Sequence, residues 1–303
     1  IQEAAGESLR LYPSPLATPA RRAVARAFDL PEEMVALGNG GDEIIEMCFR
    51  AFAGAGDSVA YPTPTYPLLE PLAGVHEVVR SPHPLNEDWG LPASFAEDPS
   101  PLKFLVNPNS PTGTWFSRAD VEAVLDRSRG VVVLDEAYVD FAPESRLDLL
   151  REGRDNLIIL RTLSKSFALA GLRVGFAVAA PGLIAALDVV KDSYNLDRLA
   201  IAGTVAAVED MEHHDRLVEY VVGERTWLAG RLRESGFEVA PSATNFLFAR
   251  PPRPASGVAA ALKDRHVLVR HYDRPPIDGW FRITVGTREQ HERLLGALEE
   301  ILN

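Results

Sequence analysis

Residues Ile159 to Phe176 read ILRTLSKSFALAGLRVGF. The apolar start predicts the end of a buried strand, and the hydroxyl-rich segment 162–166 predicts a turn that carries Lys165. Arg173 follows eight residues after this lysine. An amine in apolar surroundings loses its charge more easily and becomes a nucleophile, while hydroxyls and an arginine form a phosphate site. The combination matches what pyridoxal phosphate requires, although a lone loop lysine is more often an ordinary surface residue.

Apolar segments on either side of this turn predict the sheet that holds it. The run 102–106 predicts a buried strand, and the runs 131–134 and 157–160 are typical of central parallel strands. The run 174–179 predicts a further parallel strand after a short crossover. Helical patterns such as 117–128 lie between the strands. We therefore predict an α/β fold with a mostly parallel sheet and helices on both faces. Ligands bind such sheets beyond the carboxyl ends of the strands.

The chain is predicted to contain two domains. From Pro181 the pattern turns helical, and a new series of short strands and helices begins at Gly236. We expect a large domain over 30–235 and a smaller α+β domain over 236–303. The smaller domain is near the low end of size for independent folding, so we expect it to pack against the larger one. We expect the segment 1–29 to pack with the smaller domain.

Composition narrows the classes of function. The net charge is -12, from 43 acidic and 31 basic residues, which disfavours nucleic acid or an anionic membrane as the main partner. The single cysteine, Cys48, excludes a disulfide framework and a multi-cysteine zinc site. No run of the sequence is long and apolar enough to span a bilayer, and no signal peptide is visible, so we expect a cytoplasmic protein.

An acidic residue, Asp135, ends the apolar run 131–134. A carboxylate at the end of a buried strand is expected to point into the ligand crevice. Beside a pyridine nitrogen it would keep that nitrogen protonated and make the ring an electron sink, and Tyr138 could donate a hydrogen bond to a ring oxygen. The alternative is that Asp135 only caps the next turn. The first interpretation is stronger because Lys165 lies one strand further along the same predicted sheet.

Three further segments give weaker signals. The turn 107–113, NPNSPTG, offers side chains that contact either a ring or their own backbone. The segment 38–42, GNGGD, begins a helix whose free amides favour a phosphate. It lacks the third glycine of a dinucleotide fingerprint, which disfavours a Rossmann dehydrogenase. Tyr66 is expected either to stack on an aromatic ring of a ligand or to pack within its own loop.

Two arginines in the C-terminal region are candidates for anion binding. Arg282 lies in the otherwise apolar run 280–285, and Arg270 lies twelve residues before it. An arginine in a buried strand needs an anionic partner, which is either a substrate group or a structural Asp or Glu. The pair His213 and His214 has no third ligand nearby and predicts a solvated helix face rather than a metal site.

In order along the chain, these segments resemble the fold-type I aminotransferases of the class I/II family, and most of all the histidinol-phosphate aminotransferase group. Several motifs in the right order and spacing carry the resemblance over nearly the whole chain from Tyr12 onward. The matching segments are LYPSP, GNGGDEII, YPTPTYP, NPNSPTG, VVLDEAY, TLSKSFALAGLRVGF, SATNFLF and FRITVGTRE.

The resemblance implies a role for each candidate residue. Lys165 is expected to form the Schiff base with pyridoxal 5'-phosphate and to move protons, Asp135 to pair with the ring nitrogen, and Tyr138 to bond the ring oxygen. Tyr12 is expected to reach the cofactor phosphate of a neighbouring subunit, which implies a homodimer. The remaining cofactor contacts are expected from Gly41, Asp42, Tyr66, Asn109, Ser110, Thr162, Ser164 and Arg173.

Two departures from the family pattern bear on the substrate. The family usually has asparagine immediately before Pro-Thr-Gly, where this chain has Ser110, so the ring contact falls to Ser110, to Asn109 or to Tyr138 alone. The family's N-terminal segment, which carries a substrate contact, has no counterpart in a chain that begins at Ile1. Arg270 and Arg282 are expected to bind the anionic groups of the substrate.

The resemblance thus implies a transaminase that takes a small-molecule amino donor and a 2-oxo acid, with histidinol phosphate and 2-oxoglutarate as the expected pair. Lys165 would act as its general acid–base. An aromatic amino acid aminotransferase and a phosphothreonine-type decarboxylase on the same scaffold are the alternatives, because each needs a similar cofactor site and anion-binding arginines. A ligand-sensing aminotransferase-like domain is the non-enzymatic alternative.

Overall fold

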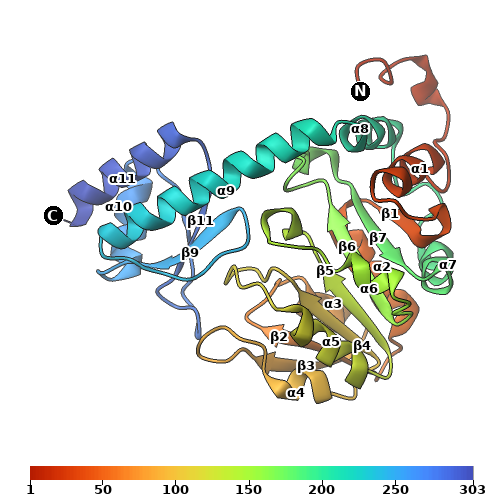
Figure 1. The fold of residues 1–303 in the computed structure, drawn as a ribbon, viewed down its shortest axis with the longest axis horizontal. Helices are drawn as coiled ribbons and strands as arrows, with labels where there is room; N and C mark the ends of the chain where they lie inside the picture. The colour runs from red at the N-terminus through yellow and green to blue at the C-terminus, as the bar shows by residue number, and fades with distance from the viewer. Residues whose placement is uncertain (303) are drawn as a thin grey trace.

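The computed structural model describes residues 1–302 and contains a seven-stranded and a four-stranded sheet (Figure 1). The larger sheet has the strand order β1-β7-β6-β5-β4-β2-β3, and its pairs from β6 to β3 are parallel. This confirms the predicted α/β fold with a mostly parallel sheet. The strands are β1 (Val35–Gly38), β2 (Ser58–Thr63), β3 (Val79–Pro84), β4 (Leu102–Val106), β5 (Val131–Asp135), β6 (Leu157–Thr162) and β7 (Gly175–Ala179).

The predicted parallel direction of the strand at 174–179 is wrong. β7 pairs antiparallel with both β6 and β1. The connection from β6 to β7 contains only the 3-10 helix η4 (Ala170–Leu172), whereas a parallel return needs a crossover that passes over a sheet face. Because the chain returns directly, the end of this connection lies beside its start. There the Leu163 N–H donates to the Val174 carbonyl at 3.0 Å.

Helices cover both faces of the larger sheet, as predicted. Alternate strand residues point to opposite faces, so Ile159 belongs to one hydrophobic core while Ile158 and Leu160 belong to the other. The first face is covered by α1 (Thr18–Ala27), α4 (Ala93–Glu97), α5 (Arg118–Arg127), α6 (Leu147–Arg151) and α8 (Arg198–Glu209), and the second by α2 (Gly40–Phe52), α3 (Leu69–Val75) and α7 (Pro181–Val190).

The smaller sheet is antiparallel and has its own core. Its strands lie in the order β10-β11-β9-β8, and helices pack their apolar faces against it. The long helix α9 (Met211–Glu234) runs from the end of α8 to this sheet and so links the two parts of the molecule (Figure 1). The other elements are β8 (Glu238–Val239), β9 (Phe246–Arg250), α10 (Ala255–Asp264), β10 (Arg270–His271), β11 (Phe281–Thr284) and α11 (Arg288–Leu302).

The N-terminal segment lies elsewhere than expected. We predicted that 1–29 packs with the smaller domain, but α1 contributes Ala20 and Val24 to a core of the larger sheet, beside α8. The small buried residues of α1 allow this close packing of two helices. The sequence does not indicate which helix these residues face. The domain boundary at 235/236 stays a prediction.

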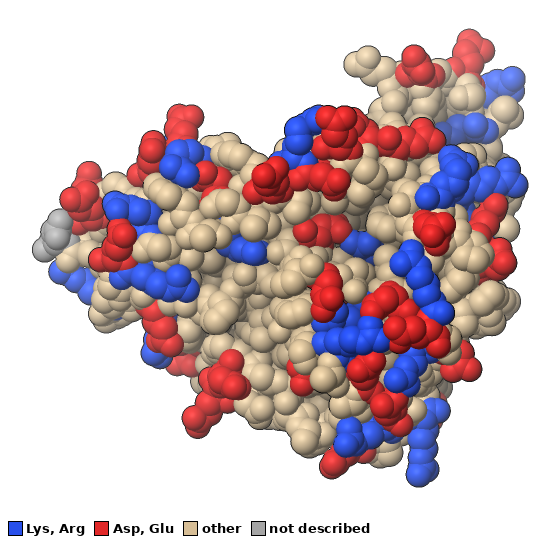
Figure 2. All heavy atoms as spheres, viewed as in Figure 1, with Lys and Arg blue, Asp and Glu red and all other residues tan. Residues whose placement is uncertain are grey.

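The edge strand β3 begins at Val79, because Val75 ends α3 and the Val79 N–H donates to the Asp57 carbonyl at 2.7 Å. On the face shown in Figure 2, acidic and basic side chains are interspersed. Within residues 1–302, no helix combines the length and apolar character needed to cross a membrane.

Candidate active site

A cavity of about 150 Å³ lies where β4, β5 and β6 end. Val106, Asp135 and Thr162, which close these three strands, all line it. Parallel strands bring their carboxyl ends to one edge of the sheet, so predicted side chains far apart in sequence converge here. The predicted residues that line the cavity are Gly41, Asp42, Tyr66, Ser110, Asp135, Tyr138, Thr162, Ser164, Lys165 and Arg173.

Lys165 lies on a turn whose backbone is fixed by its own hydrogen bonds. The Ala168 N–H donates to the Lys165 carbonyl at 3.0 Å, and the Ser164 N–H donates to the Thr162 hydroxyl at 3.1 Å. The lysine is half-buried, and its Nζ lies 5.1 Å from the centroid of the Tyr138 ring. The amine and the phenol are therefore presented to the same cavity from two different strand ends.

Asp135 is the buried acid of the cavity. Its Oδ1 accepts a hydrogen bond from the Ala137 N–H at 2.9 Å. Burial raises the pKa of Asp135 to about 6, although the Ala137 amide and the Lys165 amine partly oppose this rise. A carboxylate that is costly to ionise gains most from a cationic partner, and a protonated pyridine nitrogen is such a partner.

The N-terminus of α2 and Arg173 form the basic end of the cavity. Gly40 has φ +81°, and a Cβ there would lie 2.5 Å from Arg173 Nη2. At Gly175 a Cβ would lie 2.6 Å from the Gly41 nitrogen. These glycines let the strand, the helix end and the arginine come together. Asn39 provides no side-chain cap, so amides of the first helical turn remain open to an anion.

Asp42 already contacts two of the predicted cofactor residues. Its carboxylate accepts a hydrogen bond from the Tyr66 hydroxyl at 2.8 Å and lies 3.3 Å from Arg173 Nη2. Burial together with the hydrogen bond to Asp42 raises the pKa of Tyr66, so this phenol stays neutral. Tyr66 and Arg173 are thus oriented toward the helix end.

The structure separates the two candidates in the turn 107–113. The Asn109 side chain donates to the Pro64 carbonyl at 3.0 Å and to the Thr112 hydroxyl at 2.9 Å, and it accepts from Thr65 at 2.9 Å. Its amide is fully used in holding the turn, and Asn109 does not line the cavity. Ser110 does line it, so the geometry favours Ser110 for any contact with a ligand ring.

The two C-terminal arginines face each other across β10 and β11, where Arg270 is the register partner of Arg282. Arg282 Nη1 lies 3.4 Å from the Ser110 hydroxyl, which brings the smaller sheet to the cavity rim. In the part of the chain that the structure describes, neither guanidinium has a carboxylate within 4.0 Å. The alternative of a structural Asp or Glu partner is therefore not favoured.

Tyr12 lies away from the cavity. Its side chain is 78% exposed and stacks on Tyr194 with ring centroids 4.6 Å apart. Tyr12 does not line the cavity, and its expected contact with the cofactor phosphate of a neighbouring subunit stays a prediction.

Sequence reasoning missed the apolar residues that line the cavity. Each of them lies close in sequence to a predicted site residue, as Ala137 does to Tyr138 and Leu160 to Thr162, so this proximity is the signal that would have found them. They are Ile45, Val106, Ala137, Leu160 and Ala170.

The donors present fit pyridoxal phosphate. An aldehyde needs an amine, which Lys165 presents. A pyridine nitrogen needs a buried acid, which Asp135 supplies. A phosphate needs a guanidinium, hydroxyls and free amides, which Arg173, the β6 turn and the α2 N-terminus bring together.

Comparison with known proteins gives consistent matches over the whole chain. The family model for aminotransferase class I and II matches residues 1–298. The histidinol-phosphate aminotransferase of Geotalea uraniireducens is 42% identical over 303 residues, covering 99% of this chain and 87% of that protein. Histidinol-phosphate aminotransferase 1 of Methylococcus capsulatus is 43% identical over 302 residues, covering 98% of this chain and 84% of that protein.

Solved structures share the fold. The histidinol-phosphate aminotransferase of Sinorhizobium meliloti, solved in complex with pyridoxal-5'-phosphate, superposes with a TM-score of 0.91 at 27% identity, covering 99% of this chain and 85% of that one. The L-threonine-O-3-phosphate decarboxylase of Porphyromonas gingivalis has a TM-score of 0.84 at 23% identity, covering 97% and 91%. The second likeness is one of fold alone.

Proposed function

The chain belongs to the class I and II aminotransferases, and on this basis we propose that it transfers the amino group of histidinol phosphate to 2-oxoglutarate in histidine biosynthesis. It is a pyridoxal-phosphate-dependent transaminase. The choice of substrate rests on sequence identities of 42% and 43%, over nearly the full chain, with two proteins named as histidinol-phosphate aminotransferases.

The proposed roles follow from the chemistry of the cavity. When bound, the cofactor supplies an aldehyde for covalent attachment and a ring that accepts electrons. Lys165 provides the amine for attachment and then moves a proton to and from the substrate carbon as a general acid–base. Asp135 keeps the proton on the ring nitrogen, since its buried carboxylate is stabilised by a cation. Tyr138 would donate a hydrogen bond to the ring oxygen, and Ser110, which also lines the cavity, would offer a second contact to the ring.

The phosphate of the cofactor is proposed to lie at the basic end of the cavity. Arg173 supplies the charge, and the hydroxyls and the helix amides supply the directional donors. Tyr66 is proposed to stack on the ring, and its bond to Asp42 supports this orientation. The proposed phosphate donors are Gly41, Asp42, Thr162, Ser164 and Arg173.

Arg282 and Arg270 are proposed to hold the anionic groups of the substrate. Both are free of ion-pair partners within residues 1–302, and Arg282 is already at the cavity rim through Ser110. A phosphate monoester such as histidinol phosphate needs a dianion site of this kind, whereas phenylalanine presents only one carboxylate. This difference supports the phosphorylated donor over an aromatic amino acid.

We further propose a homodimer in which Tyr12 completes the partner's site. Sedimentation should give twice the chain mass, and Tyr12→Phe should weaken cofactor binding in the dimer. A fully active monomer would contradict this. The N-terminal region that carries Tyr12 exposes several large apolar side chains, which are Ile1, Leu9, Leu11 and Leu16.

A comparison of kcat/KM values tests the proposed substrate. Histidinol phosphate should exceed phenylalanine and tyrosine by at least about 100-fold, since a site built for a phosphate discriminates strongly against substrates that lack it. Release of carbon dioxide from threonine phosphate, without transamination, would favour the decarboxylase. A visible cofactor band without turnover of any donor would favour the sensing domain. We expect a cytoplasmic location, which cell fractionation tests.

Arg282→Ala should raise KM for histidinol phosphate by about 10- to 100-fold, because a charge-assisted bond to a phosphate is lost. The turnover number should change much less, since Arg282 acts at the substrate's anionic end. Arg253→Ala, which alters an exposed arginine of the same part of the molecule, is the control. An unchanged KM in the folded Arg282 variant would remove this residue from the substrate site.

A further inference from the structure

A buried polar cluster lies on the far side of the Lys165 turn, outside the cavity. It consists of Asp140, Arg161, Ser166 and His214, none of which lines the cofactor cavity. Three of these are almost fully buried, with exposed fractions of 6% for Arg161, 3% for Ser166 and 6% for His214. Buried polar groups are costly unless they are paired, so a cluster of this kind fixes the position of the segments that carry it.

Asp140 is the centre of the cluster, on the 3-10 helix η3 (Val139–Phe141). One carboxylate oxygen accepts a hydrogen bond from Arg161, near the end of β6, and the other accepts one from the Ser166 hydroxyl. His214 Nε2 of α9 lies 3.4 Å from the same second oxygen. One carboxylate therefore joins three elements: β6, the turn after Lys165, and the helix that leads to the smaller sheet.

The charge of Asp140 is stabilised despite its burial. Burial alone would raise the pKa of Asp140, but Arg161, His214 and Ser166 together lower it to about 2. The carboxylate is thus an anion throughout the working pH range. Arg161 is shared, because its Nε also lies 4.0 Å from the buried Glu136, which accepts hydrogen bonds from the Ser145 hydroxyl and the Arg146 N–H.

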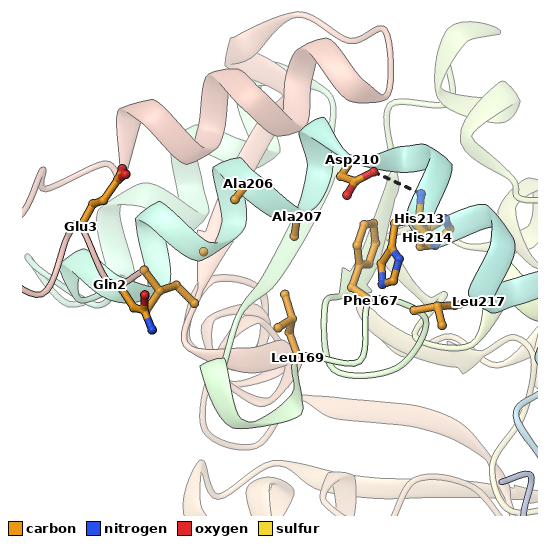
Figure 3. Close-up of a pocket in the computed structure, with 12 residues that line it drawn as sticks. Gln2, Glu3, Phe167, Leu169, Ala206, Ala207, Asp210, His213, His214 and Leu217 are labelled. Atoms are coloured by element: carbon orange, nitrogen blue, oxygen red, sulfur yellow. Dashed lines mark hydrogen bonds between the residues drawn. The ribbon is translucent and has the colours of Figure 1, made fainter. Parts of the chain in front are cut away.

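His214 forms the outer side of the cluster. Its ring lies against Phe167 with centroids 4.3 Å apart, and its Nδ1 lies 2.9 Å from Asp215. Figure 3 shows these two rings side by side at one end of a second cavity, of about 590 Å³, with His213 and Asp210 nearby on the same helix region. Phe167 follows Ser166 in the chain, so α9 contacts the lysine turn directly through the Phe167 ring and indirectly through Asp140, which both His214 and Ser166 contact.

We propose that Asp140 and Ser166 are positioning residues for the Lys165 amine, with His214 supporting Asp140 from α9. Asp140 follows Tyr138 by two residues, and Ser166 follows Lys165 directly. The Asp140–Ser166 hydrogen bond is thus a direct link between the segment that carries the phenol and the segment that carries the amine. The distance and angle between these two groups depend on it. The inference rests on the proposed role of Lys165 in the transaminase.

A purely structural ion pair would give a different result from a positioning residue. A structural role predicts lower stability with normal chemistry in the protein that remains folded. A positioning role predicts an altered environment of Lys165 in fully folded enzyme, because small misplacements of a catalytic group cost about 10- to 100-fold in rate. The protonation of the lysine–cofactor linkage reports that environment directly, without substrate.

The experiment uses the cofactor-loaded enzyme and the variants Ser166→Ala, Asp140→Asn and Glu224→Gln. Ser166→Ala removes the link without leaving a charge unpaired, so it keeps the test open if Asp140→Asn does not fold. Glu224→Gln is the matched control, since Glu224 is a buried acid paired with Arg288 and His291 far from the lysine turn. The readouts are visible absorbance as a function of pH without substrate, thermal unfolding of cofactor-free protein, and kcat with KM.

We expect Ser166→Ala to shift the midpoint of the absorbance titration and to lower kcat by about tenfold, with KM changed much less. Glu224→Gln should lower thermal stability only. Folded Ser166→Ala enzyme with an unchanged titration midpoint and unchanged kcat would overturn the proposal. Failure of the proposed substrate is distinguishable, because the titration needs only the lysine and the cofactor. Absence of the wild-type absorbance band would instead refute the role of Lys165.

Discussion

Asp135 illustrates a residue whose function opposes stability. Its pKa in the folded, cofactor-free protein is about 6, against an ordinary value of 3.8. The folded state therefore binds this proton more tightly than the unfolded state does. Its contribution to stability is complete below about pH 4 and is lost as the pH rises through about 6. A protonated ring nitrogen would pair with the carboxylate that forms above this pH.

Asp135→Asn should stabilise the cofactor-free protein at pH 8 by about 1–3 kcal/mol relative to wild type, because it removes a buried charge while keeping an acceptor for the Ala137 N–H. The difference should vanish near pH 4. Turnover of the loaded enzyme should fall by about 100-fold or more, as a charge partner is lost. Urea unfolding at pH 4, 6 and 8 measures the stabilities, and equal or lower stability of the variant at pH 8 would contradict the prediction.

The sequence was most informative where a polar residue ends an apolar strand. Asp135 was predicted for this reason and lines the cavity, as does Thr162, which was predicted from the hydroxyl-rich turn that follows such a strand. It was least informative in the turn 107–113, where amide side chains serve either a ligand or their own backbone. Asn107 and Asn109 both bond their surroundings, and only the folded turn shows that Ser110 is the side chain left facing the cavity.

The elements around the cavity depend on close contacts that a sequence pattern does not encode. The antiparallel return of β7 brings Arg173 and Gly175 to the N-terminus of α2, where Gly40 has no room for a side chain. The glycine-rich segment predicted a helix start whose free amides favour a phosphate, but it did not predict a contact with Arg173. Its contact with Arg173 needs the direction of β7, which was predicted incorrectly.

Gly40→Ala tests this contact against a matched control. Gly40 and Gly56 have φ values of +81° and +87°, so alanine is strained at both by about 1 kcal/mol. Only at Gly40 would the new Cβ meet Arg173, since the space around Gly56 is open. We expect similar losses of thermal stability but a weaker cofactor Kd, by about tenfold, for Gly40→Ala alone. Equal cofactor affinities in the two variants would show that Arg173 is not displaced.

At the scale of the molecule, the two sheets are joined by contacts between segments far apart in sequence. Arg225 of α9 donates to the Phe141 carbonyl at 3.0 Å and to the Thr244 carbonyl at 2.7 Å. The Ala243 N–H donates to the Gly113 carbonyl at 2.9 Å, so the turn that carries Ser110 is bonded to the loop between β8 and β9. Local patterns predicted the central strands and the helix α5, but they hold no information about such contacts. This is also why the packing of the segment 1–29 was misplaced.

Trp89 is a further contact between the two parts, and its loss should affect substrate binding at a distance. It lies on the loop between β3 and α4 and meets Phe248 and Trp280 edge-on, with centroids 5.7 and 5.8 Å away. Trp280 directly precedes β11, which carries Arg282. Since such aromatic pairs contribute about 0.5–1.5 kcal/mol, Trp89→Ala should raise KM for the phosphorylated donor by about 2- to 10-fold, with kcat nearly unchanged.

The control for Trp89→Ala is Trp227→Ala, which removes a tryptophan that packs on Arg288 within the smaller part of the molecule. Both variants should unfold at lower temperature than the wild type, because each loses buried apolar area. Only the Trp89 variant loosens the smaller sheet relative to the cavity, so only that variant should bind the donor more weakly. Steady-state kinetics well below both unfolding temperatures separate the two effects. If both variants raised KM equally, general destabilisation would account for the change, and Trp89 would have no specific part in placing Arg282 over the cavity.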